Sequence, residues 1–194
     1  MHSVYKLQGP KTPDWGDYSD ILVSGMASDL MRQDGMLELE RTGPFVPAIT
    51  LPGPGLIVVT DAFKKSMEGS DLTGFTFRPV IKSRIVRLEW ERWDRTADEP
   101  EEYPETGEPE DYILGRRHSP QLAKQIGELW EVCLGEHAEL VPYSGITNWD
   151  GTDWFKAKGS GEVYVSERAK TWLEQTAPEW VSFGRVSVHD RTAV

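Results

Sequence analysis

Two segments of the chain share one pattern, and this pattern restricts the fold more than any other feature of the sequence. Residues 55–80 and 161–186 align without a gap at an offset of 106 positions. The matched pairs are Val59 with Val165, Thr60 with Ser166, Asp61 with Glu167, Lys64 with Lys170, Met67 with Leu173, Glu68 with Glu174, Ser70 with Thr176 and Phe77 with Phe183. Such a repeat arises either by duplication or by chance similarity of a common local pattern, and the sequence leaves both open.

Each copy predicts a strand, a helix and a second strand. A short β-branched run ends at Thr60 or Ser166, and this hydroxyl residue is expected to cap the helix that follows. The acid at the next position faces the positive end of the helix. In the first copy, Phe63 and Met67 have the four-residue spacing of one helix face, and the second strand runs through 75–77.

Several shorter elements are predicted elsewhere. Residues 20–25 have the composition of a strand, and residues 36–41, after Asp34-Gly35, that of a hairpin arm. The alternation over 85–92 predicts a half-exposed antiparallel strand. A long helix is expected from Ser119, followed by proline at its first position. Its apolar stripe comprises Leu122, Ile126, Leu129 and Cys133.

Together these elements predict an α+β fold in a single domain, residues 1–194. The sheet is expected to be mixed or mainly antiparallel, with two or three helices. The two repeated segments would form two similar strand–helix–strand units within it.

The residues between 96 and 112 form an acidic loop that prolines interrupt. From position 98 to 111 there are eight carboxylates and no basic residue: Asp98, Glu99, Glu101, Glu102, Glu105, Glu108, Glu110 and Asp111. The loop is either a solvated connection, as most charge runs are, or a surface that steers a basic protein partner toward the chain. The spacing of an EF-hand calcium loop is absent.

The net charge of −11, from 32 acidic and 21 basic residues, comes mostly from this loop. The remaining 24 acids against 21 basic residues give only −3. Nucleic acids and anionic membranes bind basic surfaces, so we expect a protein partner instead; the oligomeric state is left open. The longest apolar run, residues 56–59, is too short to span a bilayer, and no signal-peptide pattern occurs. We therefore expect a cytoplasmic protein.

The sequence contains no recognisable catalytic or metal-binding motif, so we expect no cofactor, no metal and no catalytic residue. Metal-ligand spacing is absent around the histidines, which are His2, His118, His137 and His189. The single cysteine, Cys133, lies on the stripe of the expected helix and is interpreted as a buried structural thiol. The alternative is an enzyme whose site is assembled from dispersed residues near Arg116 and His118.

Residues 148–155 hold an aromatic cluster among Asp, Thr and Gly. Trp149 and Trp154 either pack beneath this loop or anchor a partner at an interface. Packing is slightly favoured. With the eight acids, these two tryptophans complete the set of candidate partner-binding residues.

The repeated segments also resemble a group of bacterial proteins. The residues that carry the resemblance are Val58-Val59-Thr60-Asp61, Leu72-Thr73-Gly74-Phe75, Phe77-Arg78-Pro79-Val80 and Val163-Tyr164-Val165-Ser166-Glu167-Arg168-Ala169. The group includes immunity proteins of polymorphic toxin systems and the myxobacterial double-CxxCG paralogues. The resemblance covers about a quarter of the chain, and with one cysteine the chain lacks the paired CxxCG motifs.

This resemblance implies an inhibitor that binds a cognate toxin and blocks its active site. No catalytic residue carries over, because such a role needs none. An acidic immunity protein would suit a basic toxin such as a nuclease.

Overall fold

A computed structural model describes residues 3–189, apart from the side chains of Asp29 and Met31. The helices in this part are α1 (Asp17–Ser24), α2 (Asp61–Glu68), α3 (Asp111–Leu114), α4 (Pro120–Gln125), α5 (Glu167–Thr176) and a 3-10 turn, η1 (Trp90–Arg92). The strands are β1 (Val4–Gln8), β2 (Met26–Gln33), β3 (Met36–Gly43), β4 (Ile49–Thr50), β5 (Val58–Thr60), β6 (Phe75–Pro79), β7 (Ile81–Arg87), β8 (Leu129–Leu134), β9 (Glu136–Val141), β10 (Gly145–Thr147), β11 (Trp154–Lys158), β12 (Val163–Ser166), β13 (Ser182–Val186) and β14 (Val188–His189).

The strands form three sheets, and the α+β class predicted from the sequence is confirmed. One sheet has the order β13-β1-β12-β11-β9-β10-β14, a second β4-β5-β8-β6 and a third β2-β3-β7. Most pairs are antiparallel, but β9 with β11, β10 with β14 and β3 with β7 are parallel. Five α-helices occur in the described residues, more than the two or three expected, because α1 was assigned to a strand and the four-residue α3 to a loop.

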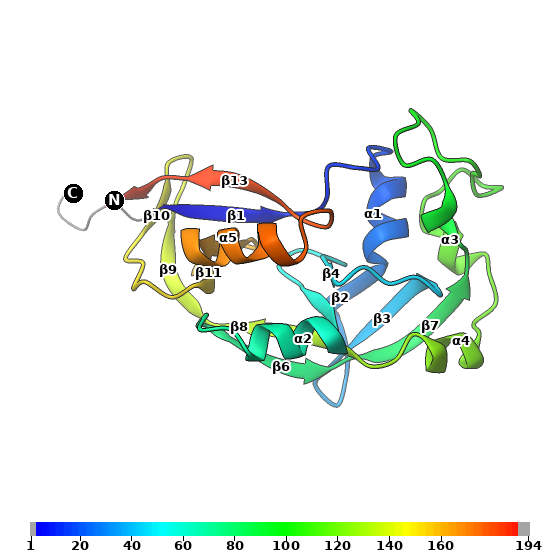
Figure 1. Ribbon diagram of the computed structural model, residues 1–194, viewed down its shortest axis with the longest axis horizontal. Helices are drawn as coiled ribbons and strands as arrows, with labels where there is room; N and C mark the ends of the chain where they lie inside the picture. Colours follow the sequence, from blue (N-terminus) through cyan, green and yellow to red (C-terminus); the bar gives the residue numbers. More distant parts are fainter. Residues whose placement is uncertain (1–2, 190–194) are drawn as a thin grey trace.

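The molecule is elongated, with different elements at its two ends (Figure 1). The seven-stranded sheet lies at one end, where β9 and β10 are found. The three-stranded sheet lies at the other end together with α1, α3 and α4, and the four-stranded sheet connects the two. None of the helices in residues 3–189 is long and apolar enough to cross a membrane.

Both repeated segments form the strand–helix–strand units that the sequence predicts, as β5-α2-β6 and β12-α5-β13. Thr60 Oγ1 accepts a hydrogen bond from Phe63 N at 3.3 Å, and Ser166 Oγ accepts one from Ala169 N at 3.2 Å. These bonds satisfy backbone donors that a helix start leaves without a partner. The predicted caps are therefore confirmed.

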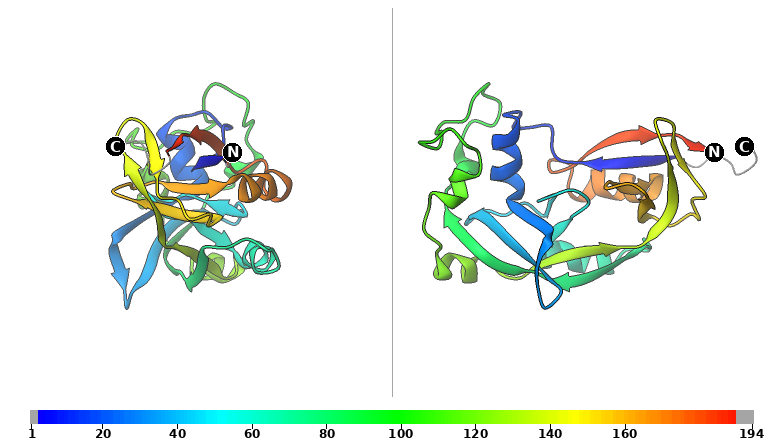
Figure 2. Two further views of the ribbon diagram at one scale, coloured as in Figure 1. Left: turned by 90° about the vertical axis from the view of Figure 1, so that its left-hand side faces the viewer. Right: turned by 180° about the vertical axis from the view of Figure 1, so that it is seen from behind.

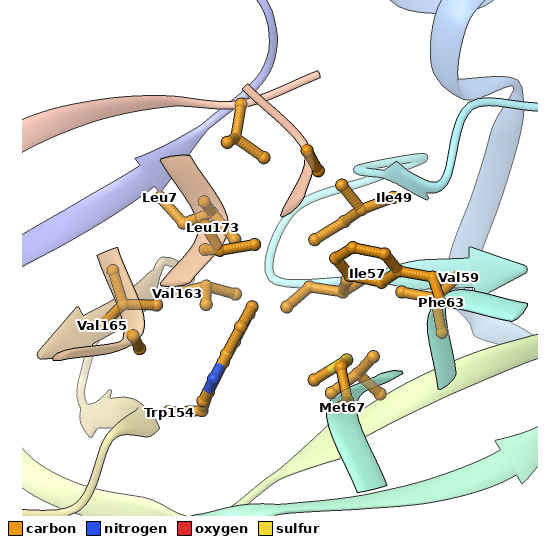
Figure 3. Packing of buried hydrophobic residues seen from close by; sticks show 14 residues of the cluster. Leu7, Ile49, Ile57, Val59, Phe63, Met67, Trp154, Val163, Val165 and Leu173 are labelled. Atoms are coloured by element: carbon orange, nitrogen blue, oxygen red, sulfur yellow. The ribbon is translucent and has the colours of Figure 1, made fainter. Parts of the chain in front are cut away.

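The two units share one hydrophobic core, with α2 and α5 in contact through Phe63 and Trp172, whose ring centroids are 5.3 Å apart. Figure 3 shows side chains of both units converging in this core. The buried members are Leu7, Ile49, Ile57, Val59, Phe63, Met67, Val132, Trp154, Val163, Val165, Ala169, Leu173, Ala177 and Val181.

The sequence prediction is wrong for residues 20–25, which belong to α1 and its C-terminal Gly25. Asp17 and Asp20 lie in the first turn, where carboxylates are favourable. Leu22 and Val23 are buried against aromatic side chains of the loops around the helix. A six-residue window was too short to separate this buried helix face from a strand.

The helix predicted from Ser119 begins there, with Ser119 Oγ accepting a hydrogen bond from Leu122 N at 3.2 Å, but its predicted length is wrong. Helix α4 ends at Gln125, and Gly127 adopts a positive φ of 74° that stops the helix. Leu129 and Cys133 lie instead on β8, which inserts between β5 and β6. The helical spacing of the four apolar residues therefore does not reflect a helix. Residues 129–134 form a strand because β5 and β6, which are distant in the sequence, pair with them.

Two further predictions concern β3 and β7. The hairpin is confirmed, since β3 pairs antiparallel with β2 across Asp34-Gly35, whose φ angles of 52° and 78° are those of a tight hairpin turn. The strand expected over 85–92 is β7, which ends at Arg87 and is followed by η1. It pairs parallel with β3 and not antiparallel as expected, because a long crossover through β4, β5, α2 and β6 joins them.

Replacing Ser166 with alanine is expected to lower the free energy of unfolding by about 2–3 kcal/mol. Ser166 caps α5 and also donates its hydroxyl proton to the buried carboxylate of Asp153 at 2.6 Å. The matched variant Thr60→Ala removes only the cap of α2 and is expected to cost about 1 kcal/mol. Chemical denaturation of both variants tests this, and equal losses would show that the bond to Asp153 contributes nothing.

Candidate functional site

The eight acids of the predicted acidic loop lie on the surface at the end of the molecule that carries α1 and α3 (Figure 1). Seven are exposed, and Asp111, the first residue of α3, is half-buried. The sequence analysis therefore correctly predicts that the acidic residues 98–111 lie on an exposed segment.

The backbone of this segment is held by aromatic side chains beneath it. The buried Tyr112 donates its hydroxyl proton to Glu102 O, Tyr18 Oη donates to Gly107 O at 2.6 Å, and Trp15 Nε1 donates to Ala97 O at 2.8 Å. Burial, and secondly the charge of Glu102, raise the pKa of Tyr112, so its hydroxyl keeps its proton and remains a donor. The acids are thus presented on an ordered loop.

The aromatic side chains belong to a second hydrophobic cluster below the loop. Trp15 packs against Trp93 at a centroid distance of 6.0 Å, and Tyr112 packs against Trp93 at 6.2 Å. Trp90 is fully buried in the same cluster. This cluster joins α1, η1 and α3, and it gives the acidic loop a rigid support.

Three of the acids also hold the loop itself. Glu102 forms an ion pair with Arg116, Glu101 accepts a hydrogen bond from Asp94 N at 3.0 Å, and Asp111 accepts one from Thr106 Oγ1 at 2.6 Å. The remaining five acids, which are exposed, are Asp98, Glu99, Glu105, Glu108 and Glu110.

Two exposed apolar side chains accompany the acids. Tyr103 is 46% exposed and packs edge-on against Tyr18 at 5.2 Å, and Leu114, at the end of α3, is 49% exposed. We call the surface formed by the eight acids, Tyr103 and Leu114 the acidic surface. The sequence analysis did not single out Leu114, because a lone apolar residue after a charge run gives no signal of its exposure.

The start of α1 adds negative charge at the same end of the molecule (Figure 1). Asp14 and Asp17 are exposed, and Tyr18, the second residue of α1, contacts Tyr103 of the loop. Burial, and secondly the charge of Asp17, raise the pKa of Asp20 in the same helix. The sequence analysis did not place a helix start at Asp17, since residues 20–25 were assigned to a strand.

The structure does not bring Trp149 and Trp154 to the acidic surface. Trp149 lies in the connection between β10 and β11, and Trp154 is the first residue of β11. Both strands belong to the sheet at the opposite end of the molecule (Figures 1 and 2). Trp154 is fully buried in the main core, so its assignment as a partner-binding residue is wrong. Trp149 is half-buried, stacks on Phe155 at 5.8 Å and donates Nε1–H to Thr152 O at 2.9 Å. The packing interpretation is thus supported over an anchor role.

The loop of Trp149 has a further polar contact. His137 Nδ1 lies 2.7 Å from Asp150 Oδ2. Burial acts to raise the pKa of Asp150, but hydrogen bonds from Thr152 and His137 outweigh it and lower the pKa to about 2. These contacts of Asp150 are consistent with a loop held in place by its own side chains, and they do not by themselves form a site.

The residues of the enzyme alternative have structural partners. Arg116 pairs with Glu102, and Arg116 O accepts a hydrogen bond from Arg84. His118 Nδ1 accepts a hydrogen bond from Ile85 N at 2.9 Å. Burial, and secondly the charge of Glu131, raise the pKa of Cys133, which disfavours a reactive thiolate. No cluster of metal-ligating side chains occurs in the described residues, and His2 lies outside them.

A groove of about 650 Å³ borders the acidic surface where the loop begins, at Arg95 and Thr96. Two of its cations pair with acids within the groove, since Arg95 lies 3.6 Å from Glu179 and Lys170 lies 2.8 Å from Glu174, and Lys11 also lines it. The residues proposed for the enzyme alternative do not line it.

Comparisons of this chain with protein-family models, with curated proteins and with solved structures gave no match. The family resemblance stated from the sequence is thus left as a hypothesis.

Proposed function

We propose that this chain is a non-enzymatic binding protein of the immunity type, which neutralises a basic toxin by holding it against the acidic surface. The observation that carries the proposal is the exposure of seven acids on a loop that Tyr112, Tyr18 and Trp15 tie to a buried aromatic cluster. Because the loop is ordered before binding, little conformational entropy is lost when a partner docks.

The composition of the acidic surface supports a protein partner. Clustered carboxylates steer a basic protein and raise its association rate, an effect that salt screens over about 8 Å at physiological ionic strength. Charges alone contribute little to residence time, whereas exposed aromatic and aliphatic side chains act as anchors. Tyr103 supplies such a side chain within the loop, and Leu114 supplies one at the end of α3, three residues after Asp111.

The test compares two variants that carry the same charge. The first neutralises four acids of the acidic surface that do not hold the loop: Glu99→Gln, Glu105→Gln, Glu108→Gln and Glu110→Gln. The matched control neutralises four exposed acids in other parts of the chain: Asp34→Asn, Asp71→Asn, Glu128→Gln and Glu136→Gln. Each is used with the wild type to capture a partner from the native host, and the captured protein is expressed alone to measure its toxicity.

We expect the captured protein to be basic and toxic, and to lose its toxicity when the wild-type chain is co-expressed. At low salt, the first variant is expected to associate about 10-fold more slowly, with a flatter salt dependence, while the control stays near the wild type. Equal association rates and salt slopes for both variants would refute the role of the acidic surface. A captured partner that is not toxic would refute the immunity role.

A further inference from the structure

The two strand–helix–strand units are each completed by a strand from another part of the chain. Strand β8 lies between β5 and β6 and pairs antiparallel with both. Strand β1 lies between β12 and β13 and also pairs antiparallel with both. In the chain, β1 comes before the first unit but pairs with strands of the second. Strand β8 comes before the second unit but pairs with strands of the first.

The pairing registers of the two units are the same at every position that can be compared. Val59 is opposite Trp130, and its equivalent Val165 is opposite Tyr5. On the other side of the central strand the agreement continues. Phe77 is opposite Val132, and its equivalent Phe183 is opposite Leu7. The residues of β1 and β8 are therefore equivalent at an offset of 125 positions, whereas the residues of the two units are equivalent at an offset of 106.

One side-chain arrangement also occurs twice, around the aromatic residue of each central strand. In the first unit, Trp130 Nε1 donates to Asp61 at 3.1 Å, and Lys64 Nζ lies 4.6 Å from the Trp130 ring and 5.3 Å from the Phe77 ring. Lys64 also pairs with Glu68 at 2.7 Å.

The second unit repeats these contacts with the equivalent residues. Tyr5 Oη donates to Glu167 at 2.6 Å, and Lys170 Nζ lies 5.2 Å from the Tyr5 ring and 5.7 Å from the Phe183 ring. Lys170 pairs with Glu174 at 2.8 Å. A common strand–helix–strand pattern explains neither the aromatic donor from the third strand nor the lysine between two rings.

The buried residues agree as well. Four equivalent pairs lie in the shared core: Ile57 with Val163, Val59 with Val165, Phe63 with Ala169 and Met67 with Leu173. Both helices therefore turn the same face toward the same core, as Figure 3 shows for these side chains. Chance similarity of local sequence does not require this agreement in three dimensions.

We propose that the chain consists of two copies of one folding unit, β1 with β5-α2-β6 and β8 with β12-α5-β13, which have exchanged their first strands. The two copies contact each other in this chain through one surface. A single unit can then pair with a second copy of itself through the same surface, as in a strand-exchanged dimer. The acidic surface lies in the connection between the copies, residues 81–128, and belongs to neither. This inference does not depend on the proposed function.

The first test cuts the folded chain. A protease site is inserted between Glu105 and Thr106, which are exposed, and the full-length protein is cleaved after folding. Because each fragment supplies the central strand of the other's sheet, both are expected to elute together at the mass of the intact chain. They are also expected to recombine after unfolding and dilution. Separation of the fragments in buffer would overturn the exchange.

The second test asks whether β8 accepts the residues of β1 at equivalent positions. The variant Leu129→Val, Trp130→Tyr, Val132→Leu and Cys133→Gln keeps Glu131 and is expected to unfold cooperatively, with a Tm loss of no more than about 10 °C. The control Leu129→Tyr, Trp130→Val, Val132→Gln and Cys133→Leu has the same composition but exchanges the two faces of the strand, and it is expected to lose much more. Equal losses, or a greater loss in the first variant, would overturn the equivalence.

Discussion

Replacing Glu131 with alanine is expected to lower the free energy of unfolding by about 3 kcal/mol, and Tm by roughly 6–12 °C. Glu131 on β8 is buried and binds Arg32 through two hydrogen bonds of 2.6 and 2.9 Å. Arg78 approaches the same carboxylate at 4.0 Å. Without the carboxylate, the guanidinium of Arg32 would be left largely buried with its main counter-charge removed.

The double variant Arg32→Met with Glu131→Leu separates two explanations. It removes both charges and fills the space with apolar groups, so its stability is expected to be near that of the wild type. Thermal unfolding of the single and double variants at the same pH is the measurement. A double variant as unstable as Glu131→Ala would show that the loss comes from the missing ion pair itself, and not from a buried cation that has lost the Glu131 carboxylate.

Replacing Trp154 with alanine is expected to cost about 4 kcal/mol. The indole is fully buried and contacts Phe75 edge-on, with the ring centroids 6.3 Å apart. Its Nε1 has no hydrogen-bond partner within the described residues. Trp154→Phe therefore removes no polar contact and is expected to cost about 1–2 kcal/mol, from volume alone. Chemical denaturation measures both values.

The fully exposed Tyr143 provides the control for an aromatic truncation on the surface. Tyr143→Ala is expected to change the stability by less than about 0.5 kcal/mol. If Trp154→Ala were as stable as Tyr143→Ala, the indole would have to lie on the surface, and the interface interpretation of this residue would return.

Local chemistry made the repeated units predictable from the sequence. A hydroxyl residue, an acid and two apolar residues at helical spacing specify a capped helix start within about ten residues. The structure has both caps where these residues predict them, at Thr60 and Ser166. The turn at Asp34-Gly35 is specified in the same local way, because few residues adopt positive φ.

Distant partners decided the elements that the sequence did not predict. Residues 129–134 have an apolar spacing compatible with a helix, but β5 and β6 supply the hydrogen bonds that make them a strand. Residues 20–25 form a helix because the aromatic cluster covers Leu22 and Val23. For the candidate site, the acids could be predicted because charge marks exposure. The support by Tyr112, Tyr18 and Trp15 could not, since these residues are far apart in the chain.

The exchange of β1 and β8 has a consequence for how the chain reaches its fold during synthesis. Strand β1 leaves the ribosome before both repeated units but lies between β12 and β13, which are made after the first unit and β8. The β5-α2-β6 unit must likewise wait for β8, so its sheet is completed only when the chain has been made up to residue 134, and the sheet of β1 only when β13 has been made. A nascent chain of this topology keeps open strand edges for most of its translation, which exposes it to aggregation. Its high proportion of distant pairings also predicts slow folding, so that synthesis of the β12-α5-β13 unit, and not of the first unit, sets the time at which a stable core forms.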